Sequence, residues 1–291
     1  MRVHLVDAFT DRPFAGNPAA VCLLPPGAWP DDRRLQRTAA ELNQSETAFA
    51  LPLPARAEAD WAIRWFTPRV ESRLCGHATL ATAHVLRTER RLTGTVRFLT
   101  RHYGVLVTRA DRAGTFTLDF PAAPGTPVPV PAGLAAALGA EPEGAFRSAA
   151  LGDLLVVLPD EAAVRALAPD PAALAGLTRR EGLRGVIVTA AATAAATAAG
   201  PGAEYDFVSR FFAPDRGIPE DPVTGSAHTV LAPYWSARLG RSVLAGFQAS
   251  ARGGLVRTAL HGDRVHLTGA AVTVLDATLH GPAPTPDRVA P

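Results

Sequence analysis

The chain has 291 residues, of which 47% are hydrophobic and 19% charged, and its formal net charge is +2, which is typical of a globular protein with an ample core. The arginines are scattered, so the sequence shows no basic cluster of the kind that binds nucleic acid. No apolar run approaches the ~18 residues that a membrane span requires. We therefore expect neither a nucleic-acid partner nor a membrane partner.

The sequence contains no lysine, so all 29 basic residues are arginine. Chemistry that needs a Schiff base on an enzyme lysine is excluded, and with it the pyridoxal-phosphate enzymes. The lysine-containing phosphate loop of nucleotide-binding proteins is excluded for the same reason. The glycine fingerprint of dinucleotide-binding folds and the serine elbow of α/β-hydrolases are also missing. The common routes to enzymatic function are thus closed.

The cellular compartment is indicated by the cysteines and by the N-terminal segment. The two cysteines, Cys22 and Cys75, are too few for a disulfide framework and fit a reducing environment. The strand-like segment VHLVDAF begins at residue 3, so we expect no N-terminal signal. Both features predict a cytoplasmic location.

Taken in chain order, the predicted elements are short strands with a few helices between them. Apolar runs rich in β-branched and aromatic residues predict strands at residues 3–9, 19–24, 46–51, 61–66, 95–99, 104–108 and 115–120. In the second half they predict strands at 154–158, 184–189, 205–212, 243–248, 255–260, 264–269 and 271–275. Helices are expected at 31–42, 132–140, 161–168 and 171–177, and the longest ones begin near residues 76 and 225. Residues 189–203 are interpreted as a strand end that runs into a flexible loop, and the whole pattern indicates an α+β protein.

A proline-rich stretch divides the chain near its middle. Residues 119–131, DFPAAPGTPVPVP, contain five prolines, which predicts a stiff extended connector that stays outside any sheet interior. We expect an N-terminal lobe at residues 1–118 and a C-terminal lobe at residues 132–275. The tail, residues 276–291, is expected to be disordered or to pack back on the N-terminal lobe.

The two lobes contain copies of one pattern. Each copy has a strand that ends in arginine, two aromatic residues, one small residue and proline, at Arg64–Pro68 and again at Arg210–Pro214. A loop follows, and then a glycine opens a helix, at Gly76 in the first copy and at Gly225 in the second. Such internal similarity predicts two pseudo-symmetric lobes of one ancestral unit.

The duplicated helix starts suggest a binding site for an anion. A helix N-terminus carries unpaired N–H groups and about half a positive charge, and glycine lets a ligand approach the backbone closely. Two such ends that face one cleft would hold a small carboxylate without lysine or metal. The alternative is that each glycine simply begins a core helix, and the duplication favours the anion site.

Four residues near these starts are able to move protons. They are Glu46, His77, Asp221 and Ser226. A carboxylate beside the apolar strand TAFAL would be partly desolvated, which raises its pKa toward the range of a general base. Each residue also has an ordinary structural explanation: Asn43 to Glu46 as a capping box, His77 as a core histidine, Ser226 as an N-cap and Asp221 as a turn residue.

Several segments together resemble a known family. The segments VDAFTDRPFAGNPAAVCLL, NQSETAF, RWFTPRVESRLCGHATLATA, LDFPA and EDPVTGSAHTVLAPYW are similar to those of the PhzF family of phenazine-biosynthesis-like isomerases, in the same order from residue 3 to about residue 275. The resemblance implies the diaminopimelate epimerase fold, in which two lobes each wrap a curved, mostly antiparallel sheet around a central helix. It also implies a homodimer with no metal and no organic cofactor.

The same resemblance assigns roles to residues of this chain. Glu46 matches the family's proton carrier, and His77, Asp221 and Ser226 match residues that bind the substrate and assist proton transfer. We expect further substrate contacts from Asn17, Gly76, Ala78, Thr79, Gly225 and Ala227. The expected reaction is a double-bond shift on a small anionic, amino-acid-like metabolite, in a secondary-metabolite pathway.

Two other functions stay open at this point. Related racemases use two thiols, but Cys75 has Thr224 at the matching place of the repeat, so epimerisation would need Glu46 opposed by Cys75 or by another acid. Cys75 is also readily explained as a small buried residue. A binding protein that keeps the cleft without catalysis is the other possibility. A zinc site is not expected, since Cys75 and His77 lack further ligands at workable spacing.

Overall fold

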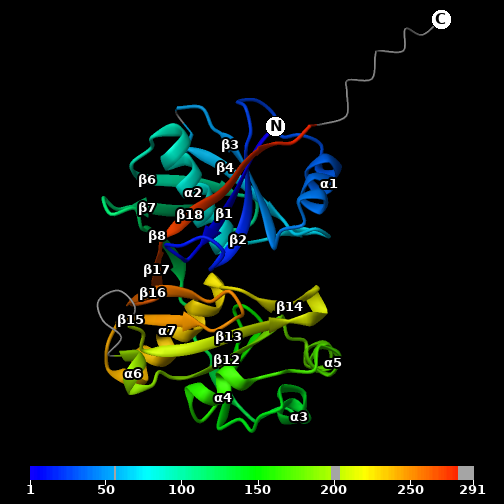
Figure 1. Ribbon diagram of the computed structural model, residues 1–291, viewed down its shortest axis with the longest axis vertical. Coiled ribbons are helices and arrows are strands. Elements are labelled where there is room, and N and C mark those ends of the chain that lie inside the picture. Colours follow the sequence, from blue (N-terminus) through cyan, green and yellow to red (C-terminus); the bar gives the residue numbers. More distant parts are fainter. Residues whose placement is uncertain (56, 198–203, 281–291) are drawn as a thin grey trace, which may run out of the picture.

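The structure of the protein is a computed structural model that describes residues 1–55, 57–197 and 204–280. Within these residues the strands form one continuous sheet of 18 strands, which curves into two lobes stacked along the long axis of the molecule (Figure 1). Residues 198–203 of the predicted loop and residues 281–291 of the predicted tail lie outside the described residues. No helix in the described ranges has the length and apolar character that crossing a membrane requires.

The N-terminal lobe is a curved sheet around one buried helix. Its strands are β1 (Arg2–Ala8), β2 (Asn17–Leu23), β3 (Glu46–Pro52), β4 (Trp61–Phe66), β5 (Glu71–Ser72), β6 (Gly94–Thr100), β7 (Val105–Ala110) and β8 (Phe116–Pro121). They surround α2 (Gly76–Arg90), whose Leu80 and Leu86 are fully buried against Trp65 and Phe98. A second helix, α1 (Asp32–Leu42), covers the outer face through Leu35 and packs in a separate cluster.

The C-terminal lobe repeats this plan. Its strands are β9 (Thr126–Val128), β10 (Gly144–Ser148), β11 (Asp153–Val157), β12 (Gly185–Ala191), β13 (Phe207–Ala213), β14 (Ile218–Asp221), β15 (Val243–Gln248), β16 (Gly254–His261) and β17 (Arg264–Gly269). The central helix is α7 (Gly225–Leu239), with Val230, Leu231 and Trp235 buried in the core. The smaller helices are α3 (Leu134–Leu138), α4 (Glu161–Ala166), α5 (Pro171–Glu181), α6 (Ala194–Thr197) and the 3-10 turn η1 (Pro214–Arg216).

The repeat predicted from the sequence is confirmed by matched contacts in the two lobes. Arg64 makes a two-pronged ion pair with Glu71, and Arg210 makes the same pair with Glu220. Each guanidinium also lies over the second aromatic residue of its motif, Phe66 in one lobe and Phe212 in the other, at 5.1 and 5.0 Å from the ring centroid. The glycines that open α2 and α7 therefore occupy equivalent places in the two lobes.

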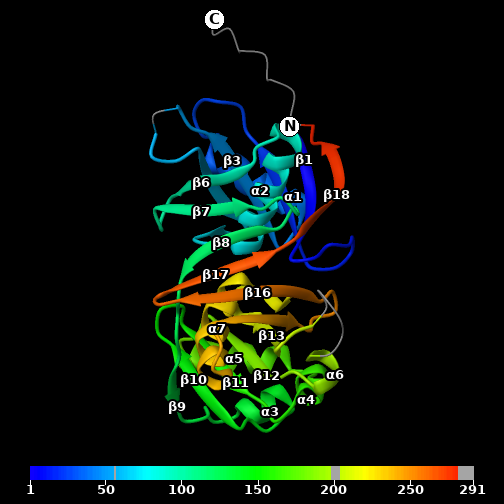
Figure 2. The same cartoon turned by 90° about the vertical axis from the view of Figure 1, so that its left-hand side faces the viewer.

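The lobes are joined by a strand pair and by an exchange of strands. Strands β8 and β17 pair antiparallel, with Leu118 opposite Leu267, and lie side by side between the lobes (Figure 2). After β8 the chain continues into β9, which pairs with β10. After β17 it continues into β18 (Ala271–Thr278), which returns to the N-terminal lobe and pairs with β1.

This exchange changes the boundaries drawn from the sequence. Residues 271–275, expected in the C-terminal lobe, belong to the N-terminal sheet together with the first part of the predicted tail. Residues 119–131 are not wholly a connector, because their ends lie in β8 and β9. Pro127 is accommodated there because, among the residues that the structure describes, β9 pairs with β10 alone, so its other edge needs no N–H donor.

The predicted α+β class, with mostly antiparallel strands around two central helices, is confirmed. Parallel pairing occurs between β2 and β3, β4 and β6, β11 and β12, and β13 and β15. The structure adds the short strands β5, β9, β10 and β14, which lack the apolar alternation that reveals a strand in sequence. Asn43 ends α1 as its C-cap and does not begin a helix, so the capping-box explanation for Glu46 was wrong and its assignment to a strand was right.

Candidate active site

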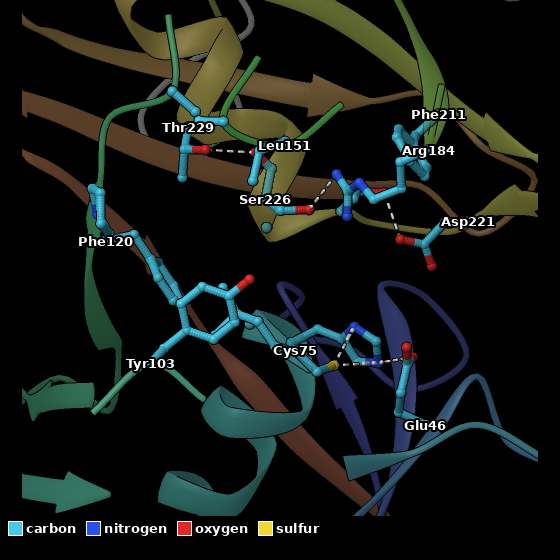
Figure 3. Close-up of a pocket in the computed structure, with 18 of the residues that line it drawn as sticks. Glu46, Cys75, Tyr103, Phe120, Leu151, Arg184, Phe211, Asp221, Ser226 and Thr229 are labelled. Carbon is cyan, nitrogen blue, oxygen red and sulfur yellow. Dashed lines mark hydrogen bonds and ion pairs between the residues drawn. The ribbon is translucent and has the colours of Figure 1, made fainter. Parts of the chain in front are cut away.

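A cavity of about 220 Å³ lies between the lobes at the starts of α2 and α7. Figure 3 shows side chains from both lobes facing it. Apolar side chains make much of the wall, namely Leu74, Phe120, Leu151, Phe211 and Ile218. All four predicted catalytic residues line the cavity, as do Cys75, Tyr103, Arg184 and Thr224. The fold thus brings together residues that lie up to 180 positions apart, from Glu46 to Ser226.

The two helix starts touch at the floor of the cavity. A methyl group built on Gly76 would lie 3.6 Å from the Cα of Gly225, and one built on Gly225 would lie 3.6 Å from the Cα of Gly76. Neither N-cap residue, Cys75 or Thr224, makes a side-chain cap hydrogen bond by standard geometry. Two positive helix ends in contact repel each other, and an anion in the cavity would relieve that repulsion.

Glu46 enters the cavity from the first position of β3. Its side chain is 12% exposed, and its Oε2 lies 3.3 Å from Nε2 of His77. The other oxygen, Oε1, lies 3.5 Å from the hydroxyl Oγ of Ser72. Burial, reinforced by the negative charge of Asp221, raises the pKa of Glu46 to about 8. At neutral pH this carboxyl therefore holds a proton and is still able to release it.

His77 and Cys75 lie next to Glu46 on the same side of the cavity. Burial lowers the pKa of His77 to about 3, so the imidazole is neutral at physiological pH. The Cys75 Sγ lies 3.5 Å from Nδ1 and 3.9 Å from Nε2 of that ring. Burial and the charge of Glu46 raise the pKa of Cys75 well above its ordinary value, although the amides of Ala78 and His77 oppose this effect. The thiol is therefore protonated and a poor nucleophile.

Asn17 connects the N-terminal lobe to Asp221 in the C-terminal lobe. Its amide Nδ2 donates to Asp221 Oδ1 and to the backbone oxygen of Val223, both at 2.8 Å, and lies 3.2 Å from His77 Nδ1. The second oxygen of Asp221 accepts a hydrogen bond from Thr224 Oγ1. Burial raises the pKa of Asp221 to about 6, while these donors oppose the rise. With both oxygens held, Asp221 is better placed to orient neighbours than to take a proton from a carbon.

Ser226 and Arg184 line the opposite side of the cavity. Ser226 is the second residue of α7, and its Oγ accepts a hydrogen bond from Arg184 NH2 at 3.0 Å. It is not an N-cap, because Thr224 holds that position. Arg184 precedes β12 and forms a two-pronged ion pair with the fully buried Asp153. Arg184 was not among the predicted site residues because nothing in the repeated motif marks it; the one signal was its place as the first residue of a predicted strand.

The predicted substrate contacts fall into three groups. Gly76 and Gly225 line the cavity as expected. Asn17 lies behind it and holds Asp221. The side chains of Ala78, Thr79 and Ala227 do not line it, because the 100° turn per residue of a helix directs them into the core, where Thr79 Oγ1 donates to the backbone oxygen of Cys75.

The site also contains a set of side chains able to hold a metal ion. Within the described residues, Glu46, Cys75 and His77 each offer a ligand atom, and these atoms lie within 4.8 Å of one another. Catalytic zinc sites use three protein ligands and a water, so the third ligand that the sequence analysis did not find is present. A metal would have to displace the Cys75 proton, which the raised pKa of that thiol opposes.

Comparison with known proteins places this geometry in a family. The family model described as phenazine biosynthesis-like protein, PhzC-PhzF, matches residues 6–277. The chain belongs to this family. An uncharacterized isomerase of Pseudomonas aeruginosa is 46% identical over 281 residues, which cover 96% of this chain and 99% of that protein.

Solved structures agree with this assignment. The crystal structure of a PhzF-family protein of Enterococcus faecalis has a TM-score of 0.83 and 38% identity, covering 96% of this chain and 99% of that one. A probable proline racemase of Agrobacterium radiobacter shares the fold alone, with a TM-score of 0.61 and 12% identity over 96% of this chain and 92% of its own. The predicted family, fold class and enzyme class, an isomerase, are confirmed. The roles of individual PhzF-like site residues stay predictions.

Proposed function

We propose that the protein is a cofactor-independent isomerase that shifts a double bond by moving a proton along a small carboxylate-bearing, amino-acid-like metabolite, with Glu46 as the general acid and base. The observation that carries this proposal is the position of Glu46: buried at the wall of the interlobe cavity, with a pKa near 8 and 3.3 Å from a neutral imidazole. A general base works best when its pKa lies near the working pH. The fraction of Glu46 that is ionised would accept a proton from carbon.

The reaction balances within substrate and enzyme. The ionised Glu46 accepts a proton from one carbon, the electron pair of that C–H bond moves into the conjugated system, and the double bond shifts. The carboxylic acid, whose O–H proton exchanges with solvent, then delivers a proton to a distant carbon on the same face. Substrate and product are isomers, so the step needs no oxidant and no second reactant. Positioned acid–base help of this kind contributes roughly 10²–10⁴-fold.

The asymmetry of the repeat supports a single proton carrier. In the register of the strands, Glu46 is opposite Ala19 and precedes the pair Thr47–Phe66. Gly185 holds the equivalent place in the other lobe, opposite Asp153 and before the pair Val186–Phe212. A methyl group on Gly185 would lie 2.5 Å from the ring of Phe211, so a side chain there would require that ring to move. The second lobe thus offers no mirror image of the Glu46 carboxylate.

The arrangement of Cys75 argues against epimerisation. Inversion by two acids needs one on each face of the reacting carbon, and contacts of about 3–3.5 Å on either side place them roughly 6–7 Å apart. The ligand atoms of Glu46 and Cys75 lie within 4.8 Å of each other, on the same side of the cavity. A carbon does not fit between them. This geometry favours the double-bond shift.

Catalysis in deuterated water tests the proposal. The purified protein is incubated with a panel of small unsaturated carboxylates, and proton NMR follows where deuterium enters. The expected result is label at a second carbon together with a shifted double bond, lost in Glu46→Gln. Label confined to one stereocentre would instead establish an epimerase. Binding that is saturable and unchanged in Glu46→Gln, with no exchange in either protein, would show a non-catalytic binding protein.

A further inference from the structure

Arg184 reaches the cavity from the C-terminal lobe, across from the proposed proton carrier. Figure 3 shows its guanidinium beside Ser226, facing the side on which Glu46 and Cys75 lie. Its positive charge lowers the pKa of both Glu46 and Asp221, although burial outweighs this effect in each case. The cation is therefore close enough to act on the groups of the site. The double-bond shift described above gives it no role.

The guanidinium is held rigidly by its other contacts. Nε and NH2 donate to the two oxygens of Asp153, whose side chain is fully buried, and NH2 also donates to Ser226 Oγ. The guanidinium carbon lies 5.3 Å from the ring centroid of Phe211. Within the described part of the chain, NH1 has no hydrogen-bond partner. A side chain fixed in this way presents its remaining N–H bonds without further loss of rotamer freedom.

A structural role explains only part of this arrangement. An ion pair between Arg184 and Asp153 would connect β11 to the start of β12 even if the guanidinium did not reach the cavity. It does not require the guanidinium to line the cavity or to bond Ser226 in the first turn of α7. A fixed guanidinium beside a helix N-terminus is a strong combination for a carboxylate, which both groups bind through N–H donors.

We propose that Arg184, with Ser226 and the first turn of α7, binds the carboxylate of the substrate, and that the substrate is a compact monocarboxylate with an apolar body. This inference rests on the proposed function. The volume of about 220 Å³ lies below the ~300–1,000 Å³ of drug-sized ligand pockets, which limits the substrate to a small molecule. Beyond the polar residues the wall is apolar, at Leu74, Phe120, Leu151 and Ile218.

This placement also orients the substrate. With its carboxylate at Arg184 and Ser226 in the C-terminal lobe, the substrate extends its apolar body toward the N-terminal lobe, where Glu46 lies beside His77. The reacting carbons are then directed at the carboxyl of Glu46. Arg184 is thus a substrate-binding residue, and Asp153 is the positioning residue that holds it.

The test uses a matched acid and amide. Cyclohex-1-ene-1-carboxylate and cyclohex-1-ene-1-carboxamide have the same shape, and only the first is an anion. Their affinities are measured by ligand-observed NMR for wild type, Arg184→Gln, Arg184→Lys and the control Arg180→Gln, which removes an exposed arginine of α5. Hydrogen bonds to charged groups predict that Arg184→Gln weakens binding of the acid by about 10- to 100-fold and leaves the amide unchanged. Arg184→Lys should restore part of the preference, and Arg180→Gln should match wild type.

Several outcomes would overturn the inference. Equal affinity of wild type for acid and amide would do so, as would an unchanged preference in a folded Arg184→Gln. If Arg184→Gln does not fold, a folded Arg184→Lys with the full wild-type preference and equal affinity would contradict the inference, because lysine lacks the fixed guanidinium that Asp153 and Ser226 hold in place. Binding and catalysis are separated by Glu46→Gln, which should keep the acid affinity. The two proposals can also fail separately. If the protein prefers the acid in a way that depends on Arg184, but no carboxylate of the panel exchanges deuterium, this inference holds and the proposed isomerisation fails.

Discussion

The Cα atoms of Gly76 and Gly225, 149 residues apart in the chain, face each other at the floor of the cavity, so that a methyl group on either would lie 3.6 Å from the other's Cα. They are equivalent residues of the two repeats, and each is the first residue of a fifteen-residue central helix. The near-symmetric contact brings two positive helix ends to one point. The chemistry around that point is not symmetric, because Glu46 lies on one side and Arg184 on the other.

Because the two glycines are in contact, we expect their substitutions to have strongly non-additive effects on the free energy of unfolding. Gly76→Ala and Gly225→Ala alone place a methyl group at ordinary contact distances, so each should change the free energy of unfolding by less than about 1 kcal/mol. Together the two methyl groups compete for one space, and we expect a coupling of about 1–3 kcal/mol in urea unfolding. Gly176→Ala in α5, with open space around it, is the control. Additive effects would contradict the contact.

Removal of the proposed proton carrier should abolish catalysis without harming the fold. Glu46→Gln keeps the shape of the side chain but cannot exchange a proton, so the turnover rate should fall by about 10²–10⁴-fold or more. Glu41→Gln, on the exposed face of α1, serves as the control. The measurement is the rate of deuterium incorporation on any substrate that the panel reveals. Retention of full activity in Glu46→Gln would reassign the proton to another group.

The raised pKa of Glu46 also predicts how stability depends on pH. In the folded protein its pKa is about 8, against about 4.3 for an exposed glutamate, so between these values the native state binds more protons than the unfolded chain. Stability contributed by this group is therefore lost as the pH rises from about 5 to about 8. Relative to wild type, Glu46→Gln should gain stability across that window and then keep a constant difference. Urea unfolding at pH 5 to 9 measures it, and a difference that stays flat throughout would show an ordinary pKa.

The turnover rate should depend on the same ionisation of Glu46, but it should rise with pH where the stability falls. If the ionised carboxylate begins the reaction by accepting a proton from carbon, the turnover rate rises with pH and levels off above about 8. Glu46→Asp, which moves the carboxyl back toward the strand, should shift the midpoint and lower the plateau. A rate that falls through pH 8 would mean that the carboxylic acid acts first, by protonating the substrate.

Asn17 should couple the lobes through Asp221. Asn17→Ala removes the donor to Asp221 Oδ1 and to the oxygen of Val223, both in buried surroundings, and should lower the free energy of unfolding by about 2–3 kcal/mol. Ser45→Ala, which removes only a 3.2 Å bond to Asn17 Oδ1, should cost less than half as much. Equal losses in the two variants would show that the contact between the lobes does not depend on this amide.

Much of the architecture was predictable because it depends on local sequence patterns. The repeated run from Arg64 to Pro68 and from Arg210 to Pro214 marks a strand, and the glycine after it marks a helix start, since both signals depend on neighbours in the chain. Glu46 was recognisable because a carboxyl at the edge of an apolar strand is exceptional. The lobes, the two central helices and the four proposed catalytic residues followed from these signals.

The tertiary structure decided what depends on distant pairing. The return of β18 to the N-terminal lobe depends on its pairing with β1, and the junction of the lobes depends on the pairing of β8 with β17; no local pattern specifies either pair. The place of Arg184 opposite Glu46, and the close packing of the Phe211 ring on Gly185, arise only when strands from different parts of the chain lie in register. Composition and spacing determine which groups exist, whereas burial and proximity determine their pKa values and partners, because both depend on atoms that the chain brings together only on folding.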